Sequence, residues 1–223
     1  GSLASRTLGS LRADSNAAKN GLELSYDTIL RGKDGVSHSV KMRNRRVQII
    51  DTEAVDGHDL VSTIDVDIQD MAEKALVAKL KEPMVNGILG MAIVMEVSTG
   101  EVKAIVNMPR EKDGNYYEMK NSAVSDLMEP GSTFKTASMM LAMDDGHATL
   151  NTTVDCCGGI YPMHGRNMKD HNWHRGGYGV IDITKVLMVS SNIGVSRVID
   201  ENYHNQPEKY VEGLYKLGIA TPL

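Results

Sequence analysis

One short stretch of the sequence constrains the fold and the chemistry of this chain more than any other. A proline and a glycine interrupt the chain just before Ser132, and residues 132–145 then have the pattern of a helix that Gly146 ends. Residues three apart lie on the same face of a helix, with their Cβ atoms about 5 to 6 Å apart. Ser132 and Lys135 have this spacing, so the sequence predicts that the lysine amine reaches the serine hydroxyl.

A serine hydroxyl is a weak nucleophile unless a base lies next to it. A lysine can be that base when burial or a cationic neighbour lowers the pKa of its ammonium group. Free N–H groups at a helix start favour negative charge, and they would stabilise an oxyanion formed at this serine. The stretch therefore predicts Ser132 as a nucleophile and Lys135 as its proton acceptor. The alternative is an ordinary helix cap followed by a solvated lysine, because SxxK alone is a common pattern.

A second motif helps to distinguish these two interpretations. Ser190, Ser191 and Asn192 form an SxN triplet. The chain contains one SxxK and one SxN, in that order. The residues that flank the two motifs favour the catalytic interpretation of both.

Several stretches together resemble class B penicillin-binding proteins, the serine D,D-transpeptidases that cross-link bacterial peptidoglycan. The resemblance extends through nearly all of the 223 residues. It implies an α/β (α+β) fold related to that of the serine β-lactamases, with an antiparallel sheet and helices. Beyond the two motifs, it is carried by residues 21–27, 30–35, 63–65, Gln69, 97–102, Asn107, Pro109 and 193–195.

The resemblance also implies a mechanism. Ser132 would attack the carbonyl of the penultimate D-alanine of a peptidoglycan stem peptide (D-Ala-D-Ala), release the last D-alanine and pass the acyl group to an amine of a neighbouring strand. Lys135 would be the base in acylation. Ser190 would hand the proton to the leaving group, and Asn192 would hydrogen-bond the substrate amide and Lys135. β-Lactam antibiotics would acylate the same serine, and no cofactor is implied.

One motif of the family does not occur in this sequence. In the family, a Lys-Ser/Thr-Gly triplet lies on a strand downstream of SxN, and it supplies an oxyanion donor and a lysine for the substrate carboxylate. The Lys-x-Gly triplets of this sequence, at 19–21, 33–35, 112–114 and 216–218, all lack the hydroxyl residue, although the last of them follows SxN. We expect the chain to be a fragment that ends before this motif, and to react with β-lactams poorly or not at all.

Two regions of the chain differ in character. Residues 1–58 include the basic, alternating stretch 40–50, which predicts an exposed strand with one apolar face. This region resembles part of the pedestal that raises the catalytic domain above the membrane, and we expect it to be extended and irregular. Residues 59–223 resemble the N-terminal portion of the transpeptidase domain.

The second region begins with clear signals of regular structure. Thr63 and Asp65 predict a helix start and Pro83 predicts its end, and the apolar residues between them recur at helical spacing. Residues 91–97 and 101–107 predict two strands joined by a short glycine-containing turn. The predicted buried face of the helix consists of Ile68, Met71, Ala72, Ala75, Leu76 and Leu80, and both Ile93 and Val94 are predicted to be buried in the sheet.

Charge and hydropathy limit the partners and the cellular location of this chain. The net charge of −5 and the isoelectric point of about 5.8 argue against a nucleic-acid partner. No run of eighteen apolar residues occurs, so the chain is not expected to span a membrane. By resemblance, an N-terminal anchor outside this chain would hold the catalytic domain in the periplasm. Expected partners are cell-wall synthesis proteins of the division or elongation machinery.

The segment between the two motifs is rich in sulfur and imidazole. Cys156, Cys157, His164, His171 and His174 match none of the usual zinc spacings, and adjacent cysteines rarely form a disulfide or ligate one ion well. We therefore expect neither a metal site nor a disulfide. The single tryptophan, Trp173, lies in a stretch that resembles the family's loop near the cleft, so it either lines the substrate groove or anchors the core.

Two other classes of function remain open from the sequence. A β-lactam sensor or a β-lactamase shares both motifs, and the rate of deacylation separates these proteins, because a β-lactamase turns over. A structural or zinc-binding module is the third possibility, and metal analysis of the purified chain tests it.

Overall fold

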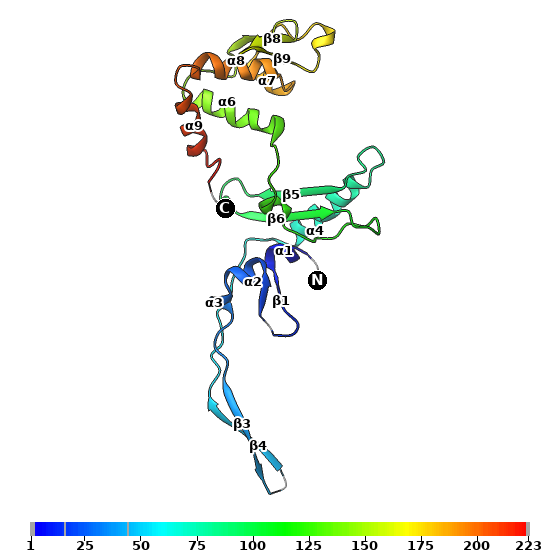
Figure 1. The fold of residues 1–223 in the computed structure, drawn as a ribbon, viewed down its shortest axis with the longest axis vertical. Helices are drawn as coiled ribbons and strands as arrows, with labels where there is room; N and C mark the ends of the chain where they lie inside the picture. The colour runs from blue at the N-terminus through cyan, green and yellow to red at the C-terminus, as the bar shows by residue number, and fades with distance from the viewer. Residues whose placement is uncertain (1–2, 16, 44, 222–223) are drawn as a thin grey trace. The chain divides into compact units, whose positions relative to one another are not determined.

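A computed structural model describes residues 3–15, 17–43 and 45–221 of the chain (Figure 1). Contacts divide the chain into two compact units, Gly1–Leu127 and Met128–Leu223. The boundary predicted between residues 58 and 59 lies within the first unit and stays a prediction. The mixture of helices and antiparallel strand pairs confirms the predicted α/β (α+β) class. Within the described ranges, no helix combines the length and the apolar character that crossing a membrane requires.

The longest helix of the first unit is α4 (Val66–Leu80). Of the two predicted start residues, Asp65 is the cap, because its carboxylate accepts hydrogen bonds from the free N–H groups of Asp67 and Ile68. Its buried face is turned relative to the prediction. Met71 and Ala75 are exposed, whereas the polar residue Gln69 is buried. Leu80 belongs to the core of this unit with Val106 and Met108, against which Ala72, Leu76, Val77, Ala92 and Tyr116 pack.

Strands β5 (Leu89–Met95) and β6 (Val102–Pro109) form the predicted antiparallel hairpin, with Ala92 opposite Val106. Residues 104–108 of β6 are buried. The prediction for β5 was wrong, because 51% of Ile93 and 37% of Val94 are exposed. The apolar run in β5 is therefore partly exposed to solvent in this unit and is not buried on both faces.

Gln69 explains why a polar residue belongs in the face of α4 that meets the sheet. Its side-chain amide donates to the carbonyl of Ile105 at 2.9 Å and accepts from the N–H of Ile105 at 2.8 Å. Asp65 donates its backbone N–H to the carbonyl of Lys103 on the same strand. These contacts satisfy polar groups of β6 along the edge that β5 does not pair.

Replacing Gln69 with leucine is expected to lower the stability of the first unit by about 2 to 4 kcal/mol, because it leaves the buried N–H and C=O of Ile105 without partners. Urea denaturation measures the loss, and hydrogen exchange at the Ile105 amide shows whether it arises there. Gln48→Leu is the matched control, because Gln48 is exposed. An Ile105 amide that exchanges equally slowly in the Gln69 variant would contradict the expectation.

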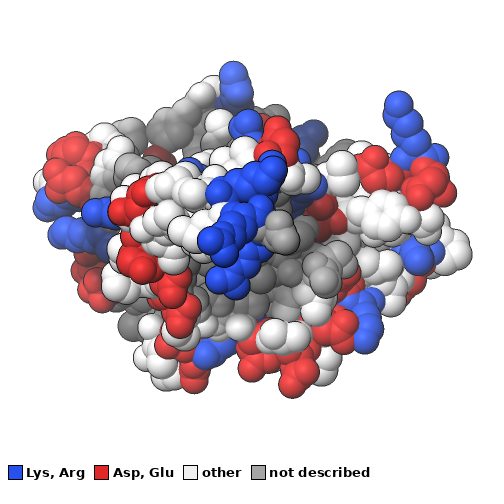
Figure 2. Space-filling view, turned by 90° about the horizontal axis from the view of Figure 1, so that it is seen from below, with Lys and Arg blue, Asp and Glu red and all other residues white. Residues whose placement is uncertain are grey.

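Residues 1–58 contain short elements and one long hairpin. Strands β3 (Val36–Met42) and β4 (Arg45–Thr52) pair from end to end, so the stretch predicted as a single strand turns back on itself. The predicted exposure is confirmed, but the described residues of the hairpin bury no apolar face. Lys41, Arg43, Arg45 and Arg46 gather at the hairpin tip, the end from which Figure 2 views the molecule. The remaining elements of the unit are α1 (Ser5–Leu8), β1 (Ser10–Leu11), β2 (Ala18–Asn20), α2 (Gly21–Ser25), α3 (Asp27–Leu30) and α5 (Ser122–Ser125).

The second unit is built mainly from helices. The turn η1 (Gly131–Thr133) leads directly into α6 (Phe134–Asp144), and Gly146 follows that helix at φ +76° as predicted. The other helices are α7 (Ile183–Met188), α8 (Asn192–Tyr203) and α9 (Pro207–Lys216). They enclose a core of Met139, Leu141, Ala142, Ala148, Val154, Cys156, Ile183, Val186, Ile193, Val195, Val198 and Tyr203.

Two small strand pairs complete this unit. Strand β7 (Thr153–Asp155) pairs with β10 (Val180–Asp182). Strands β8 (Ile160–Met163) and β9 (Arg166–Lys169) form a hairpin, and β9 lies against α8 (Figure 1). A turn, η2 (Trp173–Arg175), follows β9. The hairpin and α8 together position the SxN residues.

Candidate active site

Lys135 brings the two motifs together. It lies in the first turn of α6, and its Nζ donates hydrogen bonds to the backbone oxygen of Ser190 at 2.6 Å and to Ser190 Oγ at 3.0 Å. The two residues are 55 positions apart in the sequence. The lysine amine and the first serine of SxN therefore belong to one site.

Ser132 lies one turn before Lys135, in η1, and is exposed to solvent. Among the described residues its hydroxyl makes no hydrogen bond, and the predicted contact with the Lys135 amine is not formed, because that amine donates to Ser190. The predicted helix begins here as a tighter 3-10 turn, which keeps Ser132 and Lys135 three positions apart along one helical face. The side chain is thus accessible in the way that a nucleophile requires.

Burial changes the acid–base behaviour of Lys135. Desolvation of the ammonium group lowers the pKa of Lys135, and the nearby charge of Asp170 opposes this shift. A lowered pKa makes the neutral amine more abundant near neutral pH. A neutral amine that donates both N–H groups to Ser190 keeps its lone pair, which can accept the proton of a serine hydroxyl.

Ser190 has a backbone conformation that serine rarely adopts. Its φ is +54°, and it follows α7 at the position that glycine usually occupies in a Schellman helix end. The N–H groups of Ser190 and Ser191 close this helix end on the carbonyls of Leu187 and Val186. The left-handed conformation costs about 1 kcal/mol and points the hydroxyl toward Lys135.

Asp170 is the residue of this site that sequence reasoning missed. Its buried carboxylate accepts hydrogen bonds from Ser191 Oγ at 2.7 Å, Asn192 N at 2.6 Å and Ile193 N at 3.1 Å. It therefore satisfies the free N–H groups at the start of α8 and fixes the SxN backbone. No local pattern marks a carboxylate that caps a helix more than twenty positions away.

The Asn192 side chain is held from the hairpin. Its Nδ2 donates to the carbonyl oxygen of Lys169 at 2.7 Å. Among the described residues it makes no hydrogen bond to Lys135, and its Oδ1 remains available as an acceptor. The structure thus brings Lys135 and Ser190 into direct contact and places Asn192 beside them through Ser191 and Asp170.

Sequence comparison identifies the family. The sequence model of the penicillin-binding protein transpeptidase domain matches residues 90–222, more than half of the chain. The chain belongs to the penicillin-binding protein transpeptidase family. This confirms the resemblance inferred from the motifs, and residues 90–222 include all four predicted site residues.

Relatives of known name agree with the family. The peptidoglycan D,D-transpeptidase FtsI of Escherichia coli K12 is 30% identical over 205 residues, which are 89% of this chain and 33% of that protein. The chain therefore spans about a third of the length of this curated relative.

Solved structures confirm the transpeptidase fold. A putative peptidoglycan glycosyltransferase from Atopobium parvulum has a TM-score of 0.77 and 27% identity, over 98% of this chain and 48% of that one. The transpeptidase domain of Burkholderia pseudomallei penicillin-binding protein 3 has a TM-score of 0.60 and 27% identity, over 72% and 43% of the two chains.

The cysteines of this transpeptidase-family chain are free thiols. Cys156 is buried with its Sγ 3.3 Å from Ser191 Oγ, and burial raises the pKa of its thiol. Trp173 is 45% exposed, with Lys169 Nζ 4.7 Å from the ring centre, so it is not a core anchor. Its exposure is consistent with the groove-lining alternative.

Proposed function

We propose that this chain carries the catalytic serine, lysine and SxN residues of a peptidoglycan D,D-transpeptidase that is also acylated by β-lactams. The observation that supports this most directly is the pair of hydrogen bonds from Lys135 to Ser190, which joins the two motifs. The name of the Escherichia coli relative supports the substrate class.

In the acylation step, Ser132 Oγ forms a bond to the carbonyl carbon of the penultimate D-alanine while its proton moves to the neutral amine of Lys135. N–H groups at the start of α6 would donate hydrogen bonds to the developing oxyanion. The C–N bond to the last D-alanine then breaks. Ser190, which contacts the lysine, relays the proton to the departing amine.

In the second step, an amine of a neighbouring stem peptide attacks the acyl-enzyme. It loses a proton to Lys135, forms the new amide, and releases Ser132 as a hydroxyl. Asn192 Oδ1 would accept a hydrogen bond from the substrate amide, because its Nδ2 is occupied by Lys169. A β-lactam follows the first step only, since its leaving group stays attached to the ring-opened adduct.

The wider setting is part of the proposal. Residues 1–58 serve as a pedestal or dimerisation segment, and residues 59–223 as part of the transpeptidase domain. The catalytic domain faces the periplasm from an inner-membrane anchor. It works with cell-wall synthesis proteins of the division or elongation machinery.

A labelled penicillin tests the proposed chemistry. The protein expressed from its complete reading frame is incubated with the probe and digested with trypsin, and the adduct is located by mass spectrometry. We expect one acyl group on Ser132. The peptide of residues 121–135 also contains Ser122 and Ser125, so fragment ions must separate the three serines.

Two further measurements sharpen this test. The adduct should persist after free penicillin is removed, because a transpeptidase deacylates slowly. Rapid loss of the adduct would identify a β-lactamase. The 223-residue chain is expected to react more slowly than a product that contains a Lys-Ser/Thr-Gly motif. Labelling at a serine other than Ser132 would refute the assignment.

A further inference from the structure

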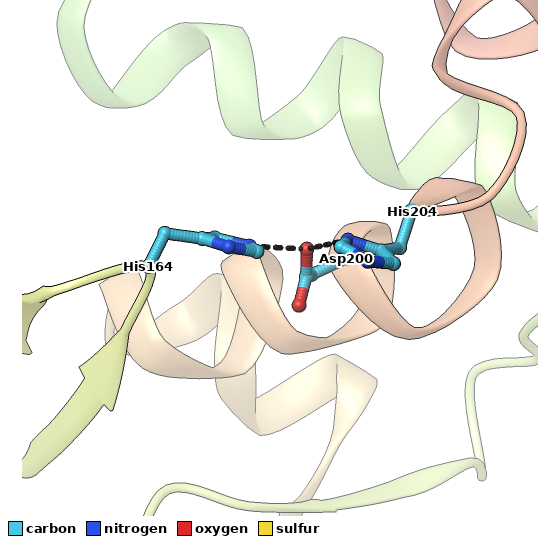
Figure 3. Close-up of side chains that lie close together, drawn as sticks. All are labelled: His164, Asp200 and His204. Carbon is cyan, nitrogen blue, oxygen red and sulfur yellow. Dashed lines mark hydrogen bonds and ion pairs between the residues drawn. The ribbon is translucent and has the colours of Figure 1, made fainter.

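A second group of reactive side chains lies in the same unit, apart from the serine site. His164 forms the tip of the β8–β9 hairpin, and Asp200 and His204 lie one turn apart at the C-terminal end of α8. Figure 3 shows both imidazole rings directed at the carboxylate of Asp200. His164 Nε2 is 2.7 Å and His204 Nδ1 3.5 Å from the same oxygen, Asp200 Oδ1.

The backbone holds His164 in this position. His164 and Gly165 both have positive φ, +46° and +77°, which is the pattern of a two-residue type I′ hairpin turn. Strand pairing continues up to the turn, where Met163 is opposite Arg166. A histidine at such a turn is presented by a rigid hairpin and not by a loose loop.

The two histidines of this group share the single carboxylate of Asp200. The rings of His164 and His204 are stacked, with centroids 5.5 Å apart and planes 12° apart. Two imidazole nitrogens and a carboxylate oxygen that converge in this way form a ligand set that binds divalent cations.

The distances suit a small metal ion. The candidate ligand atoms lie within 4.8 Å of one another. In tetrahedral zinc sites, bonds of about 2.0 to 2.2 Å place ligand atoms about 3.4 Å apart, so small rotations of the side chains are enough. The two histidines are 59% exposed and Asp200 34%, which leaves room for these rotations and for water to complete the coordination.

We propose that His164, Asp200 and His204 form a binding site for a divalent transition metal, and that Zn²⁺ is the ion it suits best. Two imidazoles and one carboxylate, with an open position, form a ligand set that zinc commonly accepts. The site includes His164 from the segment for which no metal was expected, but its other two ligands lie outside that segment. Among the described residues, the cysteines, His171 and His174 do not join it.

The position of the site indicates what the ion would do. It would join the hairpin tip to the C-terminal end of α8, whereas Asp170 and the carbonyl of Lys169 already join the hairpin to the N-terminal end of that helix. Asp200 lies eight residues after Asn192, about 12 Å along the helix. The metal therefore has a structural role, independent of the proposed acyl transfer.

Calorimetric titration of the metal-free, tag-free 223-residue chain with Zn²⁺ tests the site. We expect saturable binding of one ion and a rise of several degrees in the melting temperature. His164→Ala and His204→Ala should each weaken Zn²⁺ binding by at least about 10-fold. Removal of a residue that only orients a metal ligand already weakens binding by about 10-fold or more, and removal of a ligand should cost at least as much. The double variant should bind no ion and show no thermal shift, although its circular dichroism is unchanged.

Two controls make the test specific. His38→Ala should leave Zn²⁺ binding unchanged, because His38 pairs with Asp51 at 2.8 Å without a second imidazole. Co²⁺ should bind without a thiolate charge-transfer band, and Cys157→Ser should not alter its affinity. The proposal is overturned if no saturable binding occurs, if the double variant binds as tightly as the original chain, or if a thiolate band appears.

Discussion

Replacing Lys135 with methionine is expected to slow acylation of Ser132 by a labelled penicillin by about 10²- to 10⁴-fold, the usual contribution of a positioned base. Methionine keeps much of the buried stem but has no lone pair that accepts the serine proton. It also removes both hydrogen bonds to Ser190, so the proposed proton relay would be lost with the base. The measurement is the second-order rate of labelling of the protein expressed from its complete reading frame.

The pH dependence separates a base from a purely structural lysine. Because burial lowers the pKa of Lys135, the labelling rate should rise with pH and level off below the ordinary lysine value of about 10.4. The methionine variant should lose this rising limb. Lys185→Met is the matched control, because Lys185 is exposed on α7. An unchanged pH profile in the Lys135 variant would show that another group accepts the proton.

Replacing Asp170 with alanine is expected to destabilise the unit Met128–Leu223 by about 3 kcal/mol or more, because three donors lose one buried acceptor. The hydroxyl of Ser191 and the first N–H groups of α8 would be left without partners. Since the same contacts fix the SxN backbone, labelling at Ser132 should also become slower. Urea denaturation and labelling rates measure the two effects.

Asp170→Asn distinguishes positioning from stability. The charge of Asp170 raises the pKa of Lys135, so its removal should move the rising limb of the labelling profile to lower pH. Asp182→Ala is the matched control for a helix cap, because Asp182 makes one hydrogen bond to Lys185 N at the start of α7. That control should cost about 1 kcal/mol without a shift of the profile. If Asp170→Ala and Asp182→Ala changed stability and labelling rate equally, Asp170 would have no special role in the candidate active site.

Local signals in the sequence predicted what local physics determines. Asp65 caps α4 and Gly146 follows α6, and both depend on contacts within a few residues. Each of the motifs SxxK and SxN could be found in the sequence, because the spacing within each motif is local. Resemblance to the family then joined the two motifs.

Contacts between distant residues were not predictable in the same way. Asp170 acts on residues more than twenty positions away, and Gln69 acts on a strand thirty-six positions away. A buried polar side chain has no periodic signature, so Gln69 was assigned to no face and Met71 to the wrong one. The β3–β4 hairpin was mistaken for one strand because both of its strands are exposed, and no change of buried face marks the turn.

The left-handed backbone of Ser190 at the end of α7 lowers stability, but it places the hydroxyl beside the lysine amine. Glycine would adopt this conformation without the steric penalty, but it has no hydroxyl to place beside the amine. Replacing Ser190 to raise the thermal stability of the protein would therefore remove the proposed proton relay, so a more heat-stable variant has to be sought at other positions of this unit.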